Sequence, residues 1–110
     1  MMTLTQLAQK LLNLGYPVAY SHFVNTEKNP APMPPFICYL VVDGDTFSAD
    51  NKPIHELTFV DIELYVVTKN LAAEKKIKDM LEINELSWSY DEQFIESEGV
   101  FKCTFTITLI

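Results

Sequence analysis

The stretch LTFVDIELYVVT at residues 57–68 decides the fold, because its side chains alternate in character. One set of alternate residues is wholly apolar and comprises Val60, Ile62, Leu64 and Val66. The other set contains two carboxylates, Asp61 and Glu63. Successive side chains of a strand point to opposite faces of its sheet. The pattern therefore predicts a strand with one buried face and one polar face.

The rest of the chain predicts two helices and four further strands. Apolar residues recur at helical spacing in 3–14 and 70–84, with Thr3 and Asn70 as N-caps. Apolar or alternating runs predict the other strands, at 18–24, 36–42, 86–95 and 100–110. The order α-β-β-β-α-β-β predicts one α+β domain over residues 1–110. We expect a largely antiparallel sheet of about five strands with two helices packed on one face.

Polarity divides the second predicted helix into two sides. Its apolar stripe comprises Ala73, Ile77, Met80 and Leu81. Glu74 and Lys78 fall outside the stripe, so we expect both in solvent. They stand four residues apart in the favourable order, which predicts an ion pair along the helix surface.

Two segments are predicted to be long loops. Residues 25–35 hold four of the six prolines in the chain, which favours a stiff loop or a projecting arm. Residues 43–56 begin DGDTFSADNKP, which is polar and rich in turn-forming residues.

The charge balance argues against several partners. There are 15 acidic and 8 basic residues, for a formal net charge of −7, and every basic residue is lysine. Affinity for DNA or RNA depends on cations that displace phosphate counterions, and arginine supplies the bidentate contacts. We therefore expect no affinity for nucleic acid or for an anionic membrane, although an acidic surface can repel passing DNA. The N-terminus lacks the pattern of a secretory signal, which favours cytosolic synthesis.

Asp61 and Glu63 are a pair of carboxylates whose spacing does not exclude catalysis. On a strand they lie on the same face with their Cβ atoms roughly 7 Å apart, which is close to the separations of the two carboxylates in glycosidases. The same pair is expected on any solvated sheet face, or at a contact between subunits. The alternation favours these two interpretations, while catalysis stays open as the third.

The remaining candidate sites are weaker. A calcium loop opening at Asp43 lacks the required glycine and glutamate, which leaves a loose divalent site with Asp45 and Asp50 or a mobile acidic turn. Cys38 and Cys103 lie within apolar runs and are expected to be buried, reduced thiols. The chain contains no phosphate loop, no GxSxG and no CxxC. We therefore expect neither an enzyme nor a cofactor or metal.

Several stretches resemble one known family. They are ADN at 49–51, IELY at 62–65, Lys69 with the helix from Glu74, and ESEGVF at 96–101. This pattern, from about Ala49 to the C-terminus, is similar to the tail-terminator or tail-completion proteins of long-tailed bacteriophages and prophages. The α+β order also agrees with the fold of that family.

The resemblance implies a non-enzymatic protein of the virion, synthesised in the cytoplasm of the bacterial host. Proteins of that family form a ring, usually of six subunits, that caps the tail tube and joins it to the head connector. DNA passes through the ring without specific binding. We expect Asp61, Glu63 and Tyr65, with Asp50 and Asn51, near a subunit interface or the lumen.

Two alternatives to the tail terminator remain open. One is a head-completion or connector protein from the same gene cluster. The other is a small bacterial α+β domain with a ligand-binding or regulatory function.

Overall fold

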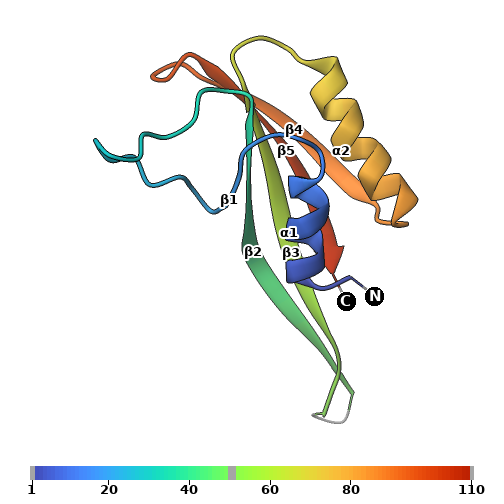
Figure 1. Cartoon of the computed structure of the whole chain (residues 1–110). Coiled ribbons are helices and arrows are strands. Elements are labelled where there is room, and N and C mark those ends of the chain that lie inside the picture. Colours follow the sequence, from blue (N-terminus) through green and yellow to red (C-terminus); the bar gives the residue numbers. More distant parts are fainter. Residues whose placement is uncertain (1, 50–51, 110) are drawn as a thin grey trace.

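Two helices and one five-stranded sheet make up the structure, which confirms the α+β class (Figure 1). This computed structural model describes residues 2–49 and 52–109, and within 43–57 it describes the backbone. The elements in chain order are α1 (Leu4–Leu12), β1 (Val18–Tyr20), β2 (Phe36–Ala49), β3 (Lys52–Val66), α2 (Leu71–Ile83), β4 (Trp88–Ile95) and β5 (Val100–Leu109).

The strand order across the sheet is β1-β2-β3-β5-β4. Neighbours in the run β2-β3-β5-β4 are antiparallel, whereas β1 lies parallel to β2. The sheet is therefore mixed, with the single parallel pair at one side. Strand β1 is shorter than the predicted strand 18–24 and is followed at once by Ser21, whose φ is 68°.

The face of the sheet toward the helices forms the core. On β3 its residues are the apolar set predicted from the alternation, each at most 2% exposed: Val60, Ile62, Leu64 and Val66. The register sets Ile62 opposite Phe105 of β5 and Tyr39 of β2. Burying a side chain of this size contributes about 1.5–3 kcal/mol, so this one face accounts for much of the stability.

Both helices begin where the sequence predicts. The Thr3 side chain accepts a bond from the backbone N–H of Gln6, whose side chain accepts one from the Thr3 N–H, which completes a capping box. Asn70 caps α2 by accepting from the N–H of Ala73. Leu7 and Leu11 of α1 and the predicted stripe of α2 are buried in the core.

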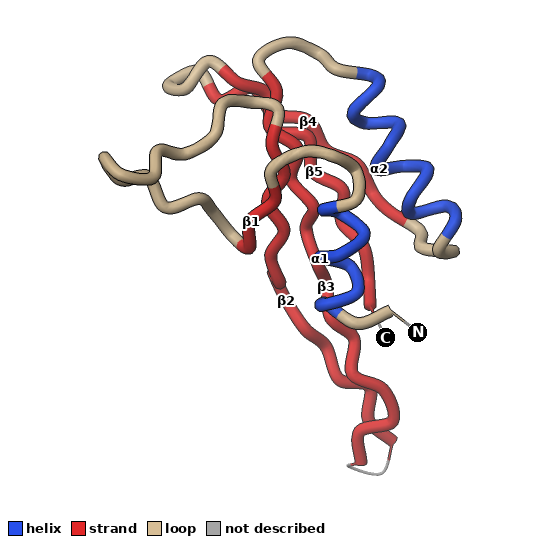
Figure 2. The backbone as a smooth tube through the Cα atoms, viewed as in Figure 1, coloured by secondary structure: helices blue, strands red, loops and turns tan. Residues whose placement is uncertain are grey.

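The prediction of a loop at 43–56 is wrong. Strands β2 and β3 continue through this segment as one long hairpin, with pairs from Asp43 and Phe59 out to Ala49 and Lys52. Figure 2 shows this hairpin running beyond the rest of the sheet. Its sequence is polar and shows no apolar alternation, and the ladder of backbone hydrogen bonds between β2 and β3 makes the strands.

The Pro-rich segment between β1 and β2 is a loop, as predicted. Thr26 and Asn29 close a turn within it, and the Asn25 side chain accepts from the N–H of Ala31. The Phe23 ring packs edge-on against Phe36 at 5.3 Å between centroids, which attaches the start of the loop to the sheet.

Candidate functional site

The face of the sheet opposite the helices carries the predicted residues Asp61, Glu63 and Tyr65. The Tyr65 hydroxyl donates to Oε1 of Glu63 at 2.9 Å, and the Thr106 hydroxyl donates to Oδ1 of Asp61 at 2.6 Å. Lys102 Nζ lies 3.9 Å from the other oxygen of Glu63. The face therefore carries one polar pair along β3 and two pairs between β3 and β5. Cross-strand pairs of this kind stabilise a sheet by a few tenths of a kcal/mol each.

The two carboxylates belong to separate hydrogen-bonded pairs. Each accepts from a different neighbour, and both are half-buried in the plane of the sheet. Burial, followed by the bond to Glu63, raises the pKa of the Tyr65 hydroxyl above its usual range, so Tyr65 stays a donor at neutral pH. Asp50 and Asn51, the other predicted residues, lie outside the described residues.

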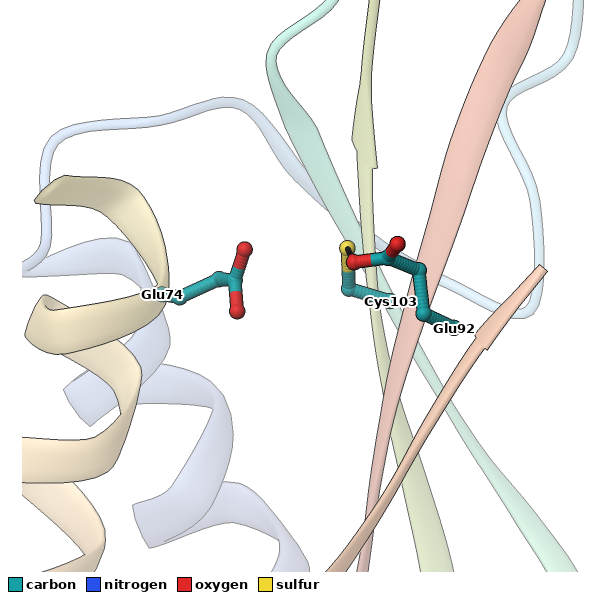
Figure 3. Close-up of side chains that lie close together, drawn as sticks. All are labelled: Glu74, Glu92 and Cys103. Atoms are coloured by element: carbon teal, nitrogen blue, oxygen red, sulfur yellow. Dashed lines mark hydrogen bonds between the residues drawn. The ribbon is translucent and has the colours of Figure 1, made fainter. Parts of the chain in front are cut away.

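A second polar cluster lies on the helix side of the sheet, where no site was predicted. It comprises Lys69, Glu74, Tyr90, Glu92 and Cys103. Figure 3 shows Glu74 extending from α2 toward Glu92 on β4 and Cys103 on β5. The Lys69 ammonium lies 3.0 Å from one oxygen of Glu74 and 3.2 Å from the Tyr90 hydroxyl, and it also donates to Glu92.

Glu74 is the residue that the sequence pattern misplaces. It is 2% exposed rather than solvated, and it pairs with Lys69 instead of Lys78. The ion pair along the surface of α2 joins Lys75 and Asp79. A helix position beside the apolar stripe can face the sheet, and a carboxylate there is tolerated because a lysine reaches it.

Contacts within the cluster shift the pKa values of four of its members. Hydrogen bonds to Glu92 and then Glu74 raise the pKa of Lys69 above its usual range, and the bond from Lys69 lowers the pKa of Glu92. Burial raises the pKa of Tyr90 and of the Cys103 thiol. A group that works as a general acid or base needs a pKa near the working pH, and these four are displaced away from it.

The same three side chains in Figure 3 have the spacing of a metal site. One ligand atom each from Glu74, Glu92 and Cys103 lies within 4.8 Å of the others. The Lys69 ammonium contacts both carboxylates, so a tethered cation already supplies the charge that a metal would bring. The arrangement fits an ion-pair network better than a divalent centre.

A pocket of about 430 Å³ lies between the Pro-rich loop and the open face of the sheet. Its lining includes His22, Phe36, Cys38, Tyr65 and Glu98. Burial, with the nearby Glu63 carboxylate as a second cause, raises the pKa of Cys38 to about 11, so the thiol is protonated and unreactive. His22 is exposed and forms a hydrogen bond with the adjacent Ser21 hydroxyl.

The two edges of the sheet are the remaining candidate surface. Strand β4 pairs with β5 along its whole length without a bulge, and its other side has no partner in the described part of the chain. On the far side, β1 covers β2 only at residues 37–39. Backbone donors and acceptors along such edges are templates for adding another strand.

Comparison with known proteins leaves the family open. No family model matches this chain, and no curated protein matches it significantly. Of the helices that the structure describes, neither is long and apolar enough to cross a membrane. The function must therefore be argued from the surfaces and contacts of the chain.

Proposed function

We propose that this chain is a non-enzymatic structural protein of a bacteriophage or prophage. It acts as a tail terminator, forming a ring of identical subunits that caps the tail tube and joins it to the head. The family resemblance suggests this role, and the shape and charge of the molecule support it.

The long hairpin of β2 and β3 carries the proposal. Strand β5 pairs with β3 only from Thr58 to Val66, so residues 45–49 and 52–57 pair with each other beyond the rest of the sheet. The molecule extends 51 Å along this direction and 29 Å across it. An isolated two-stranded hairpin is marginally stable in water. Such an arm gains stability when it lies against another subunit.

The charges suit a channel for DNA. Asp61 and Glu63 lie on the open face of the sheet, where Lys102 is their one nearby cation among the described contacts. A subunit charge of −7 repels phosphate, so DNA passes a ring of such subunits without sticking. Tyr65, which bonds to Glu63, belongs to the same surface.

Polymerisation of the tail tube protein of the same phage tests the proposal. We expect the purified chain to bind one end of growing tubes and to shorten them, with a ring visible there by negative-stain microscopy. Tubes that grow to the same length with bare ends would overturn the terminator role. Binding to the head connector without binding to tubes would favour the head-completion alternative.

The pocket beneath the Pro-rich loop supports a rival function, that of a ligand-binding or regulatory domain. Its volume of about 430 Å³ falls in the range of small-molecule sites. Phe36 and Tyr65 stack at 5.0 Å between centroids at its wall, which provides an aromatic surface. A metabolite screen by thermal shift, repeated with Phe36→Ala, would support this rival if a compound stabilised only the unsubstituted chain.

A further inference from the structure

Three segments that are distant in sequence meet around the pocket of about 430 Å³ beneath the Pro-rich loop, which we call the loop pocket. They are the chain from Ser21 to Pro34, the paired start of β2 and end of β3, and the turn between β4 and β5 (Figure 1). Phe36 and Tyr65 are partners in the β2–β3 register, and Glu98 comes from the turn. The side chains of these segments determine which class of ligand fits the loop pocket.

One wall of the loop pocket is aromatic. The rings of Phe36 and Tyr65 stack with their centroids 5.0 Å apart, and the Phe23 ring meets Phe36 edge-on at 5.3 Å. All three residues are half-buried and line the pocket. The face of an aromatic ring is negative and attracts a cation that lies within about 6 Å of the ring centre. The wall is therefore suited to an apolar group that carries a positive charge.

Two carboxylates make the electrostatic potential in the loop pocket negative. Glu98 lies in its lining, and Glu63 accepts the hydrogen bond of the Tyr65 hydroxyl at 2.9 Å. Two lining groups respond to these charges. Burial is the largest cause that raises the pKa of Tyr65, with Glu63 and Glu98 adding to it, and burial and then Glu63 raise the pKa of Cys38. A ligand in the pocket is exposed to the same field.

The described residues that line the loop pocket include no lysine, and the chain has no arginine. Lys102 lies outside this lining and reaches Glu63 at 3.9 Å, while Glu98 takes part in none of the ion pairs among the described side chains. With histidine neutral, the lining therefore has a negative net charge. A positive ligand would complete the charge balance that the described lining leaves open.

The loop side of the pocket is already ordered. The Asn25 side chain accepts a hydrogen bond from the N–H of Ala31 at 3.0 Å, which closes this part of the loop on itself. Pro32 and Pro34 add apolar surface without an N–H group that would need a partner. A pocket that is formed in advance loses less free energy to ordering when a ligand binds.

We propose that the loop pocket binds a small organic ammonium ion, with its alkyl groups against the aromatic wall and its charge balanced by Glu98. An anion would be repelled, and a metal ion would find aromatic rings where it needs several oxygen ligands. The site is independent of the proposed ring. It lies at the end of β2 and β3 opposite to the projecting hairpin.

Choline and its uncharged carbon analogue, in which a tert-butyl group replaces the trimethylammonium group, test the proposal on the full chain. Ligand-observed NMR measures both affinities at one salt concentration. We expect choline to bind more tightly than the analogue by about five-fold or more. Glu98→Gln should remove most of this difference. Glu96→Gln is the matched control, because Glu96 is exposed in the same turn but is not among the lining residues, and it should keep the difference.

Equal affinities for choline and the analogue, no binding of either, or equal effects of the two glutamate variants would overturn the site. Circular dichroism confirms that each variant is folded. Sedimentation velocity of the same samples reports on assembly separately. A chain that binds choline but forms no ring, either alone or on tail tubes, would overturn the proposed function and leave this site intact.

Discussion

At the scale of single residues, Lys69 connects the two carboxylates of the cluster on the helix side of the sheet. Its ammonium joins the buried Glu74 to Glu92 and Tyr90, and so connects the start of α2 to β4. The Lys69 side chain is 45% exposed whereas that of Glu74 is 3% exposed. The lysine therefore supplies the compensation that allows a carboxylate inside the core.

Lys69→Met is expected to destabilise the fold by about 1–3 kcal/mol, because it leaves Glu74 buried and unpaired. Lys75→Met, which breaks the exposed pair with Asp79, is the control and should change stability by less than about 0.5 kcal/mol. Urea unfolding measures both. Adding Glu74→Gln to Lys69→Met should recover part of the loss, and equal effects of the two lysine variants would contradict a role for the cluster in stability.

The cluster also predicts that the free energy of unfolding decreases at acid pH. The bond from Lys69 holds the pKa of Glu92 below its ordinary 4.5. A carboxyl with a lowered pKa stabilises the fold above the unfolded value and loses that contribution as the pH falls through the folded value. The free energy of unfolding should therefore fall more steeply below pH 4.5 in the unsubstituted chain than in Lys69→Met. Parallel pH profiles of the two proteins would contradict this account.

The two thiols should resist modification in the folded protein. Cys38 and Cys103 are free, at most 3% exposed, and have pKa values raised by burial. Since the thiolate is the reactive form, a disulfide reagent at pH 8 is expected to label neither thiol until denaturant is added. Rapid labelling of the folded chain would show that the loop over Cys38 or the core around Cys103 opens readily.

At the scale of elements, what could be predicted depended on whether an element packs on the core. The alternation around Ile62 and the stripe around Ile77 predicted their strand and helix, because burial on one face imposes the period of the backbone. The hairpin at 43–56 was missed because its sequence is polar and rich in turn-forming residues, while its strands are made by the backbone pairing of β2 with β3. The cluster around Glu74 was missed because its members are distant in sequence and meet only through the fold.

A shortened hairpin tests whether this element acts in assembly. Replacing residues 45–57 with Asn-Gly joins Gly44 to Thr58, which are paired in the register, through a tight turn. The core residues known from the described side chains lie outside the deleted segment, so the melting temperature should change little. Assembly should be lost, because the arm that the proposal places against another subunit is removed. Rings of normal size from this variant would show that the arm is dispensable.

At the scale of the whole molecule, the proposal places the polar face of the sheet toward the lumen. Asp61→Lys with Glu63→Lys reverses two charges per subunit on that face. We expect rings of this variant to retain DNA at low salt and release it as salt rises, because the new cations exchange with phosphate counterions. Electrophoretic mobility of DNA measures the effect. The control places lysine at Asp79 and Glu82 on α2, and equal DNA binding by both variants would contradict the lumen assignment.

The whole molecule also offers evidence on whether the protein acts by assembly or by catalysis. Among the described residues, the buried Glu74 forms an ion-pair network with the exposed Lys69 and Glu92, and the pocket beneath the Pro-rich loop is lined by a thiol that stays protonated. The edges and the projecting hairpin, by contrast, present backbone groups that remain available for pairing. Both features favour function through contacts between copies.

Native mass spectrometry of the full chain over a wide range of concentrations is the most direct test of that claim. The account predicts a single closed oligomer, with one stoichiometry that stays the same as concentration rises, because a heterologous contact that closes leaves no free edge. A monomer at every concentration, or an open series of ever longer oligomers, would contradict it.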